Sequence, residues 1–98
     1  NAAFTRDVGH PLTRAIKAFG ERDYGLTVNL IRPIRAIAHR FGGSHAQRDV
    51  IDLTLIEAAL RAGDGALARA LTAERSMARP DSPLSALLSR RAVDLSEN

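Results

Sequence analysis

Three residues of the types that form hydrolytic triads lie close together in the sequence, namely Ser44, His45 and Asp49. A triad places its serine and its carboxylate on opposite sides of one imidazole, whereas adjacent residues at a helix start point in different directions. A helix start explains the same residues, because Ser44 is a good N-cap and Gln47 completes a capping box. Asp49 follows His45 by one helical turn, where it can accept a hydrogen bond from the imidazole. We therefore interpret this segment as a capped helix start and predict no catalytic residues.

A metal site is the second possibility, because His39 and His45 flank the Gly42-Gly43 turn and Asp49 follows them. Zinc sites take three or four protein ligands, and the one further histidine, His10, is distant in the sequence. The chain has no cysteine, which excludes disulfides, thiolate metal sites and cysteine nucleophiles. We predict two partly exposed histidines beside a turn, and we expect neither a metal nor another cofactor.

Basic side chains form a ridge on one predicted helix, where Arg32, Arg35 and His39 follow at spacings of three and four residues. Arg40 and Arg48 extend this patch around the turn. Arginine binds carboxylates and phosphates in bidentate fashion, so the basic surface of Arg32, Arg35 and Arg48 is a hypothesis for binding an acidic protein. A solvated face paired with local acids is the other interpretation. Nucleic acid is an unlikely partner, because the chain has no Trp and one Tyr for stacking on bases.

The composition favours one small non-membrane domain. The chain has 98 residues, of which 45% are hydrophobic and 4% aromatic, and its formal net charge is +3. No apolar run approaches the ~18–20 residues of a membrane span. A cysteine-free chain is typical of the cytoplasm, which we expect as its location. Because residues 1–2 resemble the remnant of a tag and no Met opens the chain, we expect a fragment of a longer protein.

Abundant Ala and Leu, with few β-branched residues and no sustained alternation, predict an all-α fold. Pro, Gly, Ser and Asp divide the chain into about five helices. Their predicted ranges are 11–21, 23–41, 44–62, 64–79 and 83–95. The first four form two helix pairs, at 11–41 and 44–79, and the fifth is a terminal helix of the same single domain.

Apolar spacing predicts which side of each helix faces inward. In the second helix the stripe consists of Leu26, Leu30, Ile34, Ile37 and Phe41. The third helix has a wider apolar arc, formed by Ile51, Leu53, Leu55, Ile56, Ala59, Leu60 and Ala62. In the fourth and fifth helices the predicted inward residues are Leu67, Ala70, Leu71 and Met77 or Ala78, and then Leu84, Leu87, Leu88 and Leu95.

The helix pairs show the marks of a degenerate repeat. Gly63-Asp64-Gly65, Ala68 and Pro80 fit the turn, small residue and terminal proline of a tetratricopeptide pattern, and Arg22-Asp23-Tyr24 is the equivalent turn in the first pair. Asp23 and Asp64 are 41 residues apart (64 − 23), against ~34 residues in a standard repeat. We predict antiparallel helix pairs stacked as a short tetratricopeptide-like α-solenoid.

Three segments resemble the tetratricopeptide repeat protein 38 family. They are Gly42-Gly43-Ser44-His45-Ala46-Gln47-Arg48-Asp49, Thr54-Leu55-Ile56-Glu57-Ala58-Ala59-Leu60, and Glu74-Arg75 with Arg79-Pro80-Asp81-Ser82-Pro83. The resemblance covers about Arg22 to Pro83. It implies the C-terminal portion of a longer α-helical repeat protein, and it implies a fold without an activity.

These observations predict a non-enzymatic scaffold for protein–protein interaction. In stacked repeats the first helix of each pair lines a concave binding surface, which here carries Arg14, Lys17, Asp52 and Arg61. The expected partner is an unidentified protein or peptide. The alternative is a structural cap or a self-association segment, a homodimer through an exposed repeat edge, in a longer protein whose activity lies upstream.

Overall fold

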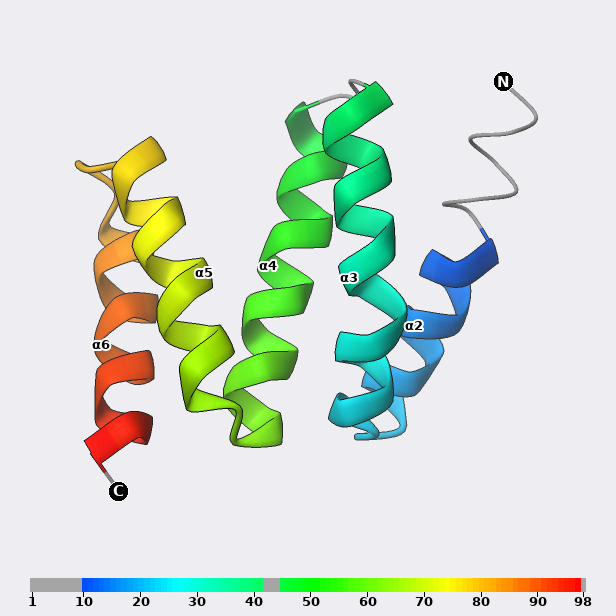
Figure 1. The fold of residues 1–98 in the computed structure, drawn as a ribbon, viewed down its shortest axis with the longest axis horizontal. Helices are drawn as coiled ribbons and strands as arrows, with labels where there is room; N and C mark the ends of the chain where they lie inside the picture. The colour runs from blue at the N-terminus through cyan, green and yellow to red at the C-terminus, as the bar shows by residue number, and fades with distance from the viewer. Residues whose placement is uncertain (1–9, 42–44, 98) are drawn as a thin grey trace. The chain divides into compact units, whose positions relative to one another are not determined.

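The computed structural model describes residues 10–41 and 45–97. Within them it contains five helices and no strand, which confirms the all-α prediction (Figure 1). The helices are α2 (His10–Gly20), α3 (Tyr24–Phe41), α4 (His45–Ala62), α5 (Gly65–Ala78) and α6 (Pro83–Glu97). Every boundary lies within two residues of the predicted one. The predicted N-cap Ser44 and the Gly42-Gly43 turn lie outside the described residues.

The chain divides into two compact units, Asn1–Ala58 and Ala59–Asn98. In the first unit α2 packs against α3, and in the second α5 packs against α6. Both pairs are antiparallel hairpins (Figure 1). None of the helices in the described ranges has the length and apolar character needed to cross a lipid bilayer.

The turns before α3 and α5 have the same construction. The backbone of Arg22 has a φ of +63°, and that of Gly63 has a φ of +79°. Each is followed by an aspartate whose amide donates to a carbonyl five residues earlier, Asp23 to Ala18 at 2.8 Å and Asp64 to Ala59 at 3.0 Å. The carboxylates of Asp23 and Asp64 accept hydrogen bonds from amides of the next helix, at 3.3 Å and 3.2 Å. Each turn thus combines a left-handed helix end with an Asp N-cap.

This equivalence predicts opposite effects of two substitutions. We expect Arg22→Gly to raise the free energy of unfolding by about 0.5–1 kcal/mol, because glycine adopts a positive φ without a Cβ penalty. We expect Gly63→Ala to lower it by about 1 kcal/mol. A Cβ at Gly63 meets nothing within 4 Å, so this cost comes from the backbone conformation. Urea unfolding followed by circular dichroism measures both, and equal stabilities would contradict the assigned turns.

The core of the first hairpin uses small and β-branched side chains. Ala15 and Ala18 of α2 are buried, as are Ile31 and Ile34 of α3. Thr27 is completely buried, and its hydroxyl donates to the Asp23 carbonyl at 2.9 Å. The buried stripe of α3 is therefore Thr27, Val28, Ile31, Ile34 and Ala38.

The predicted stripe of α3 is wrong at its first residue, because Leu26 is 40% exposed. Leu30 and Ile37 are half-buried, and Ile34 is the member of the stripe that is fully inside. The helix is rotated by about one residue, because the fully buried residues of α2 are the small Ala15 and Ala18, and the Thr27 hydroxyl comes within 3.5 Å of the Ala15 carbonyl. A threonine tolerates this position because its hydroxyl is satisfied by the preceding turn of its own helix.

Burial in α4 extends over more than one face, which confirms the wide apolar arc. The buried residues are Ile51, Leu55, Ile56, Ala58, Ala59 and Leu60. Two predicted members lie farther out, since Leu53 is half-buried and Ala62 is exposed.

The second hairpin also has an interface of small residues. The buried residues are Ala68, Leu71 and Thr72 of α5 and Ser85, Leu88 and Ala92 of α6. The hydroxyls of Ser76 and Ser89 join the two helices by a hydrogen bond of 2.9 Å. Side chains of this size let the two backbones approach closely, so the helices face each other through residues that a hydropathy stripe does not select.

Several predicted inward residues of this hairpin are on the outside. Ala70 and Ala78 are exposed, and the exposed fractions of Met77, Leu84 and Leu87 are 86%, 42% and 56%. Of the predicted inward set, Leu71 and Leu88 are buried, and Leu67 and Leu95 are half-buried. The interface combines Leu71 and Leu88 with the small residues Ala68, Ser85 and Ala92, and the apolar spacing predicted only the two leucines.

Candidate functional site

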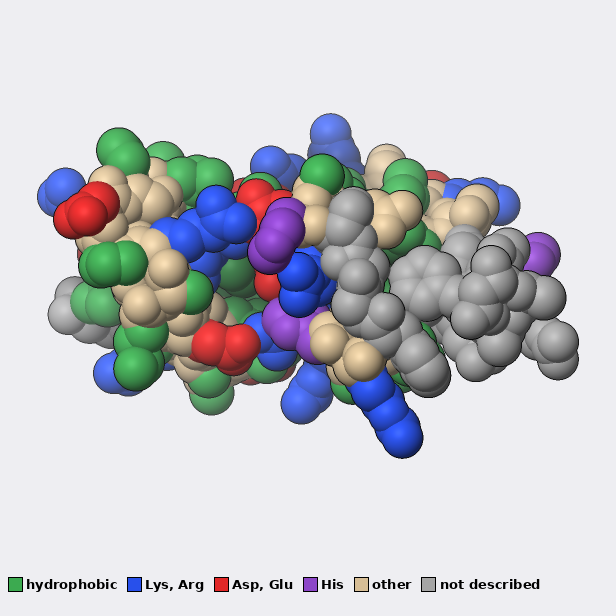
Figure 2. Space-filling view, turned by 90° about the horizontal axis from the view of Figure 1, so that it is seen from above, with side chains coloured by type: hydrophobic (Ala, Val, Ile, Leu, Met, Phe, Trp, Pro, Cys, Tyr) green, Lys and Arg blue, Asp and Glu red, His purple; other side chains and the backbone are tan. Residues whose placement is uncertain are grey.

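A cluster of charged side chains joins α3 and α4 within the first unit. The Arg35 Nε donates to the Asp52 Oδ1 at 2.8 Å, and the two side chains are 24% and 22% exposed. The His39 Nε2 lies 3.5 Å from the same carboxylate oxygen. Arg35 and His39 are one helical turn apart on α3, so both reach one acceptor on α4. Near the middle of Figure 2, histidine side chains lie beside Lys or Arg and Asp or Glu side chains.

Arg48 extends this cluster by one turn of α4. Its Nη2 lies 3.1 Å from the His45 Nδ1. A guanidinium only donates, so the imidazole nitrogen is the acceptor in this hydrogen bond. The Arg48 Nε is buried and has no hydrogen-bond partner within the described part of the chain.

The pairing joins residues from two different predicted surfaces. Asp52 was assigned to the concave surface and Arg35 to the basic surface, yet they neutralise each other. Arg32 is exposed, as are Arg14 and Lys17, which lie one turn apart on α2. Arg61 is exposed near the end of α4, in the second unit.

The carboxylate at the centre of the cluster, Asp52, is engaged by the Arg35 guanidinium. Across residues 10–41 and 45–97, no group of three or more His, Cys, Asp or Glu side chains is arranged to hold a metal ion. Ser44 lies outside these ranges, so the triad geometry is not described.

A double-mutant cycle measures the strength of the Arg35–Asp52 pair. We expect Arg35→Gln, Asp52→Asn and the double variant to give a coupling energy of about 0.5–1 kcal/mol, since the pair is partly solvated. The coupling should decrease in high salt. Arg32→Gln, on an exposed arginine one turn earlier, is the control and should not couple to Asp52→Asn. A coupling energy of zero at low salt would contradict the pairing.

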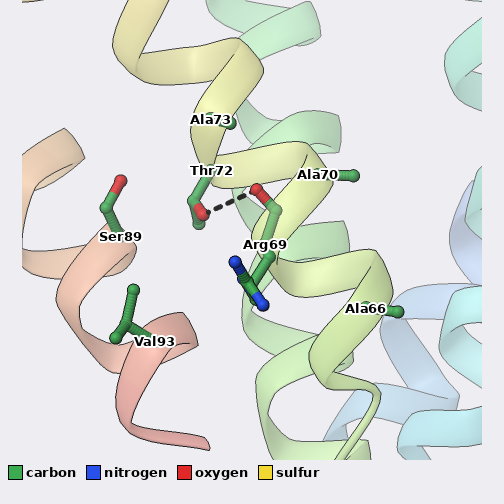
Figure 3. Close-up of a pocket in the computed structure, with 7 residues that line it drawn as sticks. All are labelled: Ala66, Arg69, Ala70, Thr72, Ala73, Ser89 and Val93. Atoms are coloured by element: carbon green, nitrogen blue, oxygen red, sulfur yellow. Dashed lines mark hydrogen bonds between the residues drawn. The ribbon is translucent and has the colours of Figure 1, made fainter. Parts of the chain in front are cut away.

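The second candidate site is a groove on the α5–α6 hairpin. It has a volume of about 500 Å³ and is lined by Ala66, Arg69, Ala70, Thr72, Ala73, Ser89 and Val93. Ser89 and Val93 lie on α6 opposite Thr72 and Arg69, whereas Ala66 and Ala70 lie along the other side of the exposed face of α5 (Figure 3). Four of the seven lining residues are Ala or Val, so the walls are mainly apolar.

The polar groups of the groove differ in whether they are already paired. The Thr72 hydroxyl donates to the Ala68 carbonyl at 2.8 Å, and the Ser89 hydroxyl bonds that of Ser76 at 2.9 Å. Arg69 is exposed, and among the described residues no acidic side chain pairs with its guanidinium. The groove therefore offers one uncommitted cation beside apolar walls.

No protein-family model and no solved structure matches this chain. The groove on α5 and α6 is the feature that the sequence analysis missed. Ala66, Ala70, Ala73 and Met77 recur at spacings of four, three and four residues, which places them on one side of α5. Of these four residues the predicted inward set contains Ala70 and Met77, and both are exposed in the structure.

Proposed function

We propose that this chain is a non-enzymatic protein–protein interaction scaffold. The observation that supports this function most directly is the groove on α5 and α6, which combines alanine and valine walls with the Arg69 guanidinium, for which the described residues supply no acidic partner. Concave surfaces that are mainly apolar, with a few oriented polar groups, are typical binding sites. The lining of the groove combines four Ala or Val side chains with one guanidinium and two hydroxyls, a mixture suited to recognising a polypeptide surface.

We further propose that the helix pairs are tetratricopeptide-like repeats that stack as an α-solenoid, in line with the resemblance to the tetratricopeptide repeat protein 38 family. The matching turns at Arg22-Asp23 and Gly63-Asp64 support this. Buried residues also recur at positions 41 residues apart, which is the spacing of Asp23 and Asp64. The coinciding buried pairs are Ala15 and Ile56, Ala18 and Ala59, Thr27 and Ala68, Ile31 and Thr72, and Ile51 and Ala92. The match is partial, since buried Val28 and Ala38 correspond to the exposed Arg69 and Arg79.

Affinity capture from a lysate of the source cells tests the scaffold function and locates its surface. The baits are the wild type, a groove variant with Ala70→Gln and Val93→Gln, a variant with Arg14→Glu and Lys17→Glu, and Arg32→Glu. All substituted side chains are exposed, so circular dichroism should show four folded baits. We expect a protein that the groove variant loses and the other three retain.

Each other outcome of the capture has a defined meaning. Loss only with Arg14→Glu and Lys17→Glu would support the surface of the first helices, and loss only with Arg32→Glu would support the basic surface. A set of captured proteins that no variant changes would contradict a specific scaffold.

Self-association is the second candidate function, and the exposure of Leu84 and Leu87 on α6 favours it. These leucines lie three residues apart and are 42% and 56% exposed. Exposed apolar side chains on one helix edge are suited to pairing between copies. Molar mass measured over a roughly hundredfold concentration range separates the two functions. A constant monomer mass would exclude self-association, and a dimer that Leu87→Ser abolishes would support it.

A further inference from the structure

The inference concerns the chemical class of partner at the groove, and it rests on the proposed scaffold function. It begins with Arg69, which is the one charged residue among those lining the groove. Its guanidinium has no acidic partner in the described residues. A cation beside apolar surface gains most from an anion that also covers that surface, because the pair is then shielded from water.

The neighbouring surface of α5 sets the shape of that partner. Ala66, Ala70 and Ala73 are exposed and present only methyl groups. These residues cover two turns of helix, a length of ~10 Å. Methyl groups allow a second backbone to approach closely, and an amphipathic helix lying along such a face uses apolar anchors at spacings of three and four residues.

The number of cations distinguishes a carboxylate from a phosphate. Phosphate sites bring together several cations or backbone amides, whereas the lining of this groove offers a single guanidinium. One carboxylate satisfies one guanidinium through two parallel hydrogen bonds. The two hydroxyls of the lining, on Thr72 and Ser89, already have partners.

We propose that the α5–α6 groove binds a helical peptide segment in which an Asp or Glu lies beside a stripe of apolar side chains. The apolar stripe covers Ala66, Ala70, Ala73 and Val93, and the carboxylate pairs with Arg69. The α5–α6 hairpin thereby selects partners by two features. Apolar contact provides affinity, and the single charge fixes the position of the peptide along the groove.

Selection from a display library of random peptides of about 16 residues tests this chemistry on the whole folded chain. The baits are the wild type, Arg69→Glu, Ala70→Gln and, as a matched control, Arg32→Glu on an exposed arginine of the first unit. We expect the wild type and Arg32→Glu to enrich apolar helical peptides that carry Asp or Glu. We expect Arg69→Glu to enrich apolar helical peptides that carry Lys or Arg in place of the Asp or Glu. We expect Ala70→Gln to enrich neither set of peptides.

A binding measurement on one selected peptide completes the test. The affinity of Arg69→Glu for an acidic peptide should be about tenfold lower than that of the wild type. Replacing the Glu of the peptide by Lys should restore binding to Arg69→Glu. If the selected peptides show no preference for Asp or Glu, and Arg69→Glu does not change their binding, the carboxylate proposal is overturned. The scaffold function would still stand in that case, provided that Ala70→Gln abolishes binding of the same peptides. Failure of every bait to enrich peptides would overturn the proposal, and the lysate capture then decides the scaffold function separately. A dimer of the wild type that Ala70→Gln dissolves would also overturn it, because the occupant would be a second copy.

Discussion

Replacing Ile31 by alanine is expected to lower the free energy of unfolding by about 2–4 kcal/mol. Ile31 is completely buried in α3, in the unit where that helix packs against α2. The substitution removes apolar contacts and leaves a cavity that the close backbones cannot collapse to fill. Urea denaturation followed by circular dichroism measures the change. A loss of this size is a large part of the stability of a small domain.

Leu26→Ala is the matched control, because Leu26 belongs to the stripe predicted from hydropathy and is 40% exposed in the structure. Leu26→Ala is expected to lower the free energy of unfolding by less than about 1 kcal/mol. Were Leu26→Ala the more damaging of the two, the rotation of α3 described here would be wrong and the hydropathy stripe would be right.

Replacing Leu88 by alanine is also expected to lower the free energy of unfolding by about 2–4 kcal/mol. Leu88 of α6 is 5% exposed in the unit where α6 packs against α5. Ala92, one turn later on α6, is also buried and is too small to fill the space that Leu88 leaves. Denaturation of this variant tests the packing of the second unit independently of α3.

The adjacent Leu87 provides the control, since it has the same side chain and is 56% exposed. Leu87→Ala is expected to cost less than about 1 kcal/mol. Because the two leucines are consecutive, they have the same local sequence and differ mainly in the direction they face. Equal losses of stability would show that α6 is not oriented as the structure describes.

The helices and their ends could be predicted from the sequence because the signals are local. Asp23 and Asp64 cap their helices through amides three residues later, and the turn glycine Gly63 has a positive φ. Pro83 begins α6, where it lacks only a hydrogen bond that the first turn does not make. Such interactions span only a few residues, so residue type and spacing are sufficient to predict them.

The rotation of each helix about its axis was predicted less accurately than the helix ends. Hydropathy assigns Leu84 and Leu87 to the core, whereas the α5–α6 interface uses Ala68, Ser85 and Ala92. The choice depends on how closely two backbones approach, which is a property of the pair and not of either helix. Thr27 is inside for the same reason, with its hydroxyl bonded to the Asp23 carbonyl.

The candidate sites depend on contacts between helices, so the sequence indicated their residues but not their pairing. Arg35 and Asp52 are 17 residues apart, and nothing in their local spacing shows that they meet. Arg69 was not selected because it does not belong to a cluster of basic residues. Its distinctive property is its place in the lining of an apolar groove with no acidic partner among residues 10–41 and 45–97, which only the arrangement of α5 and α6 reveals.

The central claim is that partners dock in the α5–α6 groove, and amide chemical-shift mapping of the isotope-labelled chain with a selected acidic peptide tests it most directly. We expect the largest shift changes in the segments from Ala66 to Ala73 and from Ser89 to Val93, which contain the groove lining. The same peptide should leave the shifts of the Ala70→Gln variant unchanged. Shift changes confined to α2 and α3, around Arg14 and Arg32, would contradict the claim and place the binding surface in the first unit.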